Sequence, residues 1–214
     1  MPAGGRFTML PHRRHFMRPL IRSLLVTLIV LFLTVPAFGA APQWELDPAH
    51  SGIYFSVQHI YSTTRGYFED FSGAVRFSPD DLAGSRFDFE VMVKSINTGN
   101  SKRDGHLNSG DFFDSQAYPK MTFTSTAVKH VKDNQYVVEG TMTVKDVSQP
   151  VTVPFTFLGT QTHPFDKKSE VAGFEARMTI DRLAYHVGGG KFFDMGVVGK
   201  DVDVLITLEV TRKK

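Results

Sequence analysis

The segment V-D-V-L-I-T-L-E-V, residues 202–210, places a branched apolar side chain at every second position. Successive side chains of a β-strand point to opposite faces, so this spacing is typical of a strand with one buried face. A helix would instead need apolar residues spaced by three and four. The segment is therefore predicted to be a half-buried antiparallel strand.

The same alternation recurs from residue 53 onward, and turn-forming residues separate the runs. Asp133-Asn134, for example, lies between two such runs and predicts a hairpin. Many strands in one domain indicate a sandwich or a closed barrel. The alternating apolar positions are Ile53, Phe55 and Val57; Val75 and Phe77; Phe87, Phe89, Val91 and Val93; Met121 and Phe123; Val151, Val153, Phe155 and Phe157; and Met178 and Ile180.

One segment breaks the strand pattern: S-K-R-D-G-H-L-N-S-G-D-F-F-D-S-Q-A-Y-P, residues 101–119. Asn100 is expected to cap a short helix ending at Asn108, with Leu107 facing inward. Gly105 within it costs about 1 kcal/mol of helix propensity. Charged and aromatic side chains in such an insertion are typical of a lid over a binding cavity. They are equally typical of a solvent-exposed turn that is anchored by one buried hydrophobic group.

The first 39 residues have the pattern of an export signal. Five arginines and no acidic residue accompany the apolar run 24–35, which is shorter than the roughly 20 residues of a membrane span. Small residues at 37 and 39 suit signal peptidase. We predict a cleavable signal peptide over 1–39 and one domain over 40–214 in the periplasm. An uncleaved anchor, a start at Met17 and twin-arginine export remain alternatives.

Composition excludes some functions and leaves others open. Of 24 basic residues five precede residue 40, so 19 basic residues face 22 acidic ones beyond it, a net charge of −3. This balance does not favour nucleic acid. The chain has no cysteine, which excludes disulfides and thiolate chemistry. Its 19 phenylalanines suit a hydrocarbon site and an ordinary packed core alike.

No catalytic or metal-binding motif is predicted. His50 and His59 are nine residues apart on one expected strand, an odd separation that points them to opposite faces. A G-x-S-x-G motif is absent from the sequence. Asp111 and Asp114 are interpreted as surface acids, and G-G-G-K at 188–191 as a flexible hairpin tip. We therefore expect a protein that is not an enzyme and that has no metal and no cofactor.

Ordered blocks of the sequence resemble the YceI family of polyisoprenoid-binding periplasmic proteins. The blocks are W-E-L-D-P-A-H-S-G-I-Y-F-S-V-Q-H-I at 44–60, R-G-Y-F at 65–68, S-I-N-T-G-N at 95–100, R-D and H-L at 103–107, D-F-F-D at 111–114, Y-P at 118–119 and G-T-M-T-V-K-D-V-S-Q-P-V-T-V-P-F at 140–155. The resemblance spans Trp44 to Val210. It departs after Ile180-Asp181-Arg182, where L-A-Y-H replaces the usual short polar residue, aromatic residue and glycine.

The resemblance implies an all-β fold: an eight-stranded antiparallel lipocalin-like barrel with one short helical segment near residues 100–114. It also implies an apolar tunnel that holds a polyprenyl chain or an isoprenoid quinone for transport or storage. A homodimer and an inner-membrane partner of the cytochrome b561 type are further expectations. The tunnel candidates are Ile53, Phe55, Val57, Phe89, Val91, Met121, Phe123, Val153, Phe155, Met178 and Ile180, and the mouth candidates are His59, Arg65, Arg103, Asp104, His106 and Asp181.

Three interpretations remain open at this stage. The first is a lipid carrier or store, in which Arg103 and Asp104 tie their segment to the barrel. The second is an accessory enzyme or redox factor that acts on such a lipid, with His59, His106 or Asp104 handling protons. The third is a fully packed barrel that serves as a protein-interaction module.

Overall fold

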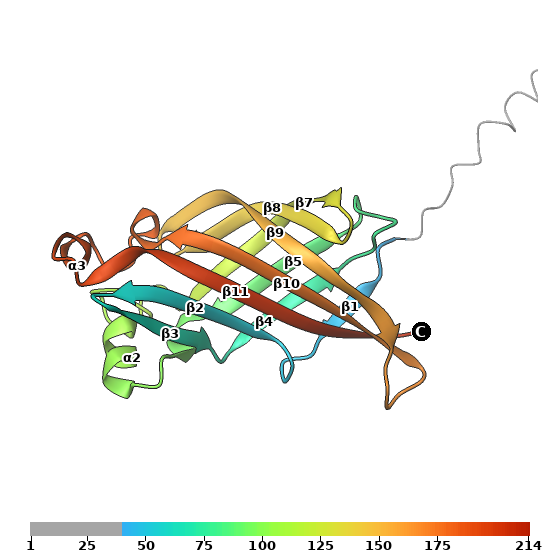
Figure 1. The fold of residues 1–214 in the computed structure, drawn as a ribbon, viewed down its shortest axis with the longest axis horizontal. Coiled ribbons are helices and arrows are strands. Elements are labelled where there is room, and N and C mark those ends of the chain that lie inside the picture. Colours follow the sequence, from blue (N-terminus) through green and yellow to red (C-terminus); the bar gives the residue numbers. More distant parts are fainter. Residues whose placement is uncertain (1–39) are drawn as a thin grey trace, which may run out of the picture. The chain divides into compact units, whose positions relative to one another are not determined.

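A computed structural model describes residues 40–214, and the predicted signal peptide lies outside the described residues. These residues form an antiparallel barrel (Figure 1), which confirms the predicted fold class. No helix in this part of the chain is long and apolar enough to cross a membrane. The elements are β1 (Gln43–Leu46), β2 (Gly52–His59), β3 (Ser62–Phe68), β4 (Phe71–Arg76), β5 (Arg86–Met92), η1 (Val93–Ser95), β6 (Ile96–Asn97), α2 (Ser101–Asn108), β7 (Lys120–Lys132), β8 (Gln135–Val144), β9 (Val147–Thr162), β10 (Ser169–Asp181), η2 (Arg182–Tyr185), α3 (Lys191–Asp194) and β11 (Val198–Lys213).

The eleven assigned strands form a barrel of eight because three of its strands are each interrupted once. β1 and β2 make up the first interrupted strand, which pairs with β11 on one side and with β4 and β3 on the other. β3 and β4 make up the second, and β6 and β5, which pair with β3 and β4, make up the third. The pairing then continues through β7, β8, β9 and β10 to β11. β11 contacts β1 and β2 in turn and closes the ring. A closed ring satisfies the backbone groups that a free sheet edge would expose.

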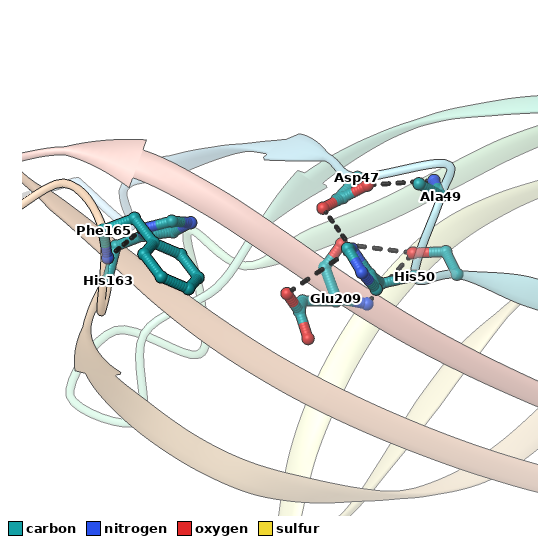
Figure 2. Close-up of polar contacts among 7 residues, drawn as sticks. Asp47, Ala49, His50, His163, Phe165 and Glu209 are labelled. Atoms are coloured by element: carbon teal, nitrogen blue, oxygen red, sulfur yellow. Dashed lines mark hydrogen bonds and ion pairs between the residues drawn. The ribbon is translucent and has the colours of Figure 1, made fainter.

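The break between β1 and β2 is held to β11 by polar contacts (Figure 2). The Asp47 amide donates to the Glu209 carbonyl over 2.9 Å, and the Ser51 hydroxyl donates to the same oxygen over 3.1 Å. The Asp47 carboxylate accepts from the Ala49 amide over 2.9 Å and lies 2.8 Å from Nδ1 of His50. This hydrogen bond raises the pKa of His50 and lowers that of Asp47.

One end of the barrel is filled by an aromatic plug around Phe77. The Phe77 side chain is 1% exposed, and five aromatic rings surround it at centroid distances of 5.0 to 5.9 Å. We call this the closed end. The aromatic plug consists of Phe77, Phe87, Tyr136, Phe155, Phe157 and Phe174.

The opposite end, which we call the lid end, carries α2 and α3 (Figure 1). α2 begins after Asn100, whose side chain accepts a hydrogen bond from the Arg103 amide over 3.0 Å, so the predicted N-cap is confirmed.

The stretch 188–191 lies in the connection between the paired strands β10 and β11, as the predicted hairpin requires. This connection is longer than a simple tip, because it also contains η2 and α3, and Lys191 is the first residue of α3. Gly188 has a φ of 84°, and a Cβ atom there would lie 2.6 Å from both Arg182 and Phe112. A close approach of backbone to these two side chains therefore requires glycine at this position.

Candidate functional site

An apolar cavity of about 250 Å³ lies inside the barrel, between the aromatic plug and the lid end. Cross-strand pairing explains why its wall is apolar. Phe55 lies opposite Val204 and Val57 opposite Val202, so these side chains share the inward face of β2 and β11. The volume lies just below the roughly 300–1,000 Å³ of common small-molecule pockets.

All the predicted tunnel residues lie on the wall of this cavity. Regular alternation produces this result, since inward positions in a barrel recur at every second residue. Contact between these side chains and a ligand remains a prediction. The residues concerned are Ile53, Phe55, Val57, Phe89, Val91, Met121, Phe123, Val153, Phe155, Met178 and Ile180.

Two segments, residues 98–119 and 182–197, cover the lid end, and we call them together the lid. Phe112 of the first segment stacks on Phe192 of the second at a centroid distance of 5.4 Å. The Lys145 ammonium donates to the carbonyl oxygens of Phe112 over 2.8 Å and His186 over 2.9 Å, which ties the two segments together. The lid contributes six residues to the cavity wall: Leu107, Phe112, Phe113, Arg182, Tyr185 and Val187.

Arg182 is the only charged side chain among the described residues that line the cavity. It is 6% exposed, and it donates to the carbonyl oxygens of Gly199, Val187 and Val198 at 2.7, 2.7 and 3.1 Å. Burial lowers the pKa of its guanidinium, and the Asp181 carboxylate opposes this effect. Arginine titrates so far above neutrality that the group stays charged.

Almost all of the surface exposed to the cavity is apolar, so Arg182 borders the cavity with its guanidinium turned toward these carbonyl groups. A guanidinium has five N–H donors, and these three bonds leave two for acceptor oxygens. Sequence reasoning missed this residue. Its partners are carbonyl groups, which any residue supplies, and the only signal was its place in the family-like I-D-R triplet.

The placement predicted for Arg65 at the mouth needs correction. Arg65 pairs with Ser56 on the outer face of the β2–β3 ribbon, whereas Phe55 and its partner Gly66 face inward. Arg65 consequently lines a hollow on the outer surface and not the cavity. His59 is the last residue of β2 and pairs with Ser62. It lies two residues beyond Val57, which is the last residue of β2 that lines the cavity.

The remaining mouth candidates hold the lid in place and do not line the cavity. The Asp104 carboxylate accepts from the amide and hydroxyl of Thr98, and Arg103 donates to the hydroxyl and carbonyl of the same residue. This agrees with the structural role favoured for both residues. His106 lies on the outer side of the lid, with Nε2 3.0 Å from the Asp111 carboxylate.

Asp181 has a similar role in the second lid segment. Its carboxylate accepts from the Leu183 amide over 2.9 Å, which caps η2, and from Lys200 over 3.2 Å. The groups considered for proton handling, His59, His106 and Asp104, are therefore all absent from the cavity wall.

Asp47, His50 and Glu209 are the one group of described residues with ligand atoms close enough to hold a metal ion, within 4.8 Å of one another. They lie at the strand break, and Nδ1 of His50 is already hydrogen-bonded to Asp47. The hydrogen bonds that join the β1–β2 break to β11 are enough to explain why these three side chains lie close together.

Comparison with known proteins identifies the family. A family model described as a YceI-like domain matches residues 44–210. The chain belongs to the YceI family. The Protein YceI of Escherichia coli O157:H7 is 31% identical over 186 residues, which are 86% of this chain and 94% of that protein. The resemblance inferred from the sequence is thus confirmed.

Solved structures support the same conclusion about the fold. BcnA of Burkholderia cenocepacia matches with a TM-score of 0.68 and 27% identity, over 79% of this chain and 100% of BcnA. A polyisoprenoid-binding domain of Saccharophagus degradans, implicated in plant cell wall breakdown, matches with a TM-score of 0.58 over 78% of this chain and 97% of that domain. At 16% identity the latter match shows a shared fold alone.

Proposed function

We propose that this YceI-family protein binds an isoprenoid-type lipid in its cavity and carries or stores it in the periplasm. The observation that carries the proposal is the cavity itself, whose exposed wall is apolar. The aromatic plug blocks the closed end, so a ligand would exchange through the lid. The polyisoprenoid-binding domain with the same fold agrees with this choice of ligand.

The lipid would lie with its tail toward the plug and its head group at the lid. Burying hydrocarbon from water contributes about 0.8 kcal/mol per CH₂ group, but a lipid taken from a bilayer is already dry. Transfer into the cavity therefore gains little from the tail. The fit of the tail and the contacts of the head group must decide which lipid is bound.

Arg182 would supply the head-group contact. Its two remaining N–H donors suit the oxygens of a polyprenyl phosphate or the carbonyl of an isoprenoid quinone. A hydrogen bond to a charged group contributes about 1.5–3 kcal/mol, so the contact corresponds to roughly a 10- to 100-fold preference for a lipid with such a group.

Binding is favoured over catalysis by the placement of the proton-handling candidates. None of His59, His106 and Asp104 lines the cavity. The alternative, an accessory or redox factor with a cytochrome b561-type partner, rests on the family resemblance. The export route and a homodimer are likewise proposals that follow from the sequence.

The decisive experiment is organic extraction of protein purified from its native periplasm without detergent, followed by mass spectrometry. We expect about one isoprenoid per protein molecule. An empty extract from well-folded protein would contradict the proposal and favour a packed interaction module.

A variant tests the role of Arg182. Arg182→Met should lower binding of a polyprenyl phosphate about 10- to 100-fold and leave binding of squalene, which has no head group, unchanged. Equal losses for both ligands would mean that Arg182 only holds the lid.

A further inference from the structure

We propose that the lid end docks on the surface of a lipid bilayer through an exposed apolar tip. This rests on the proposed function, because a bilayer is where an isoprenoid ligand resides. The apolar tip consists of Ile60 and Tyr61 in the β2–β3 turn and Phe193 and Met195 in and beside α3. Their side chains are 51%, 100%, 42% and 64% exposed. The Ile60 amide donates to the Val197 carbonyl over 3.1 Å, so the two segments form one surface.

Folding does not explain the composition of the β2–β3 turn. His59 pairs with Ser62, so Ile60 and Tyr61 form a two-residue hairpin loop, where asparagine and glycine are the usual residues. Ile60 has a φ of 49°, a left-handed conformation that a β-branched residue rarely adopts.

Other turns of the same barrel show the usual chemistry. Asp133 and Lys145 occupy turns with φ of 48° and 53°. Within residues 40–214, Ile60 is the only apolar residue other than glycine at a positive φ, since the remaining two are Asp114 and His186. An isoleucine and a fully exposed tyrosine at this position therefore indicate a contact outside the barrel.

The position of the apolar tip identifies a bilayer as its partner. Val57 lines the cavity three residues before Ile60, and Val198 lines it directly after Val197. Both segments of the apolar tip thus lie within a few residues of the cavity wall, at the end through which a lipid would exchange. Tyrosine and other large apolar side chains are favoured at the boundary between head groups and acyl chains.

The charge of the domain suggests how it would bind. Residues 40–214 carry a net charge of −3, so attraction to anionic lipids does not drive the docking. Insertion of apolar side chains should drive it, and binding should therefore depend little on salt.

Vesicle flotation tests the proposal with vesicles of phosphatidylethanolamine and phosphatidylglycerol. Ile60→Asn combined with Tyr61→Gly supplies the turn residues that this hairpin favours, so the variant should fold at least as well as the wild type. We expect its partition onto vesicles to fall about tenfold or more, because binding scales with the apolar area inserted.

Phe165→Ala is the matched control. Phe165 lies in the β9–β10 connection beside His163 (Figure 2) and is 95% exposed, but it belongs to the closed end. This variant should float like the wild type. Failure of the wild type to float, or equal losses in both variants, would overturn the proposal. A turn variant that floats normally but loses binding to a membrane protein would also overturn it.

Isoprenoid loading separates this proposal from the proposed function. The turn variant should take up a polyprenyl phosphate from detergent micelles like the wild type, and from vesicles about tenfold more slowly. If neither protein takes up the lipid from micelles, the proposed function fails, and flotation still decides whether the apolar tip docks. Equal loading rates from vesicles would overturn the docking proposal alone.

Discussion

Phe77→Ala should both destabilise the barrel and deepen its cavity. The side chain is 1% exposed and is surrounded by five aromatic rings at 5.0 to 5.9 Å. Three of its neighbours, Phe87, Phe155 and Phe174, line the cavity on their other side. Removal of the central ring therefore leaves a space into which these three rings can shift, and such a shift would deepen the cavity.

The expected loss of stability follows from burial. Replacement of a buried phenylalanine by alanine costs about 3–5 kcal/mol, and ring–ring contacts place Phe77 near the upper end. For a domain of this size each kcal/mol lowers the melting temperature by about 2–4 °C, which gives a decrease of about 10–20 °C. Thermal and urea unfolding measure both quantities. Phe165→Ala, at a 95% exposed position, should stay within about 0.5 kcal/mol of the wild type.

The bound lipid provides the second measurement. If the aromatic plug limits the depth of the cavity, mass spectrometry of lipid extracted from Phe77→Ala should show longer chains than in the wild type. A destabilisation below about 1.5 kcal/mol would refute the inference that the closed end is tightly packed. A large destabilisation with an unchanged distribution of lipid chain lengths would show that the plug stabilises the barrel but does not limit the length of the bound chain.

The other predictions concern the lid and the strand break. Lys145→Met removes two hydrogen bonds that join the lid segments, so bound lipid should transfer to vesicles about tenfold faster, and an unchanged rate would contradict this role. At the strand break, Asp47 raises the pKa of His50 above 6.5, so the stability this contact contributes is full below pH 6.5 and is lost as pH rises through the raised value. The difference in melting temperature between wild type and His50→Ala should therefore shrink toward alkaline pH, and a difference that is independent of pH would argue against the ion pair.

Alternation predicted the barrel and its inner wall because a barrel interior repeats at every second residue. The same rule failed for Arg65, since its strand, S-T-T-R-G-Y-F, has no apolar alternation that marks the inner face. The pairing of Phe55 with Gly66 reveals that face. A Cβ atom on Gly66 would lie 2.5 Å from the Phe55 ring, so the phenylalanine covers a position that the glycine leaves free.

The lid could be predicted only in part. Its first segment contains large aromatic residues outside any strand, and this composition indicated a cover. Its second segment contains G-G-G-K, which predicts a flexible tip when it is considered alone. Contacts with Phe112 and Lys145, which are distant in sequence, give this segment its conformation. The burial of Arg182 depends on carbonyl groups that the folded connection supplies, so no local pattern could indicate it.

The order of features along the barrel suggests how a lipid could be transferred without exposing its polar group to the apolar cavity. The aromatic plug lies deepest, the apolar wall follows, Arg182 lies buried in the lid, and the apolar tip is outermost. A lipid that entered tail first would move its hydrocarbon from one dry environment to another, while its head group stayed near the bilayer surface. Transfer would then require only the opening of the lid and the exchange of head-group hydrogen bonds from water to Arg182, which are two small steps in place of one costly desolvation.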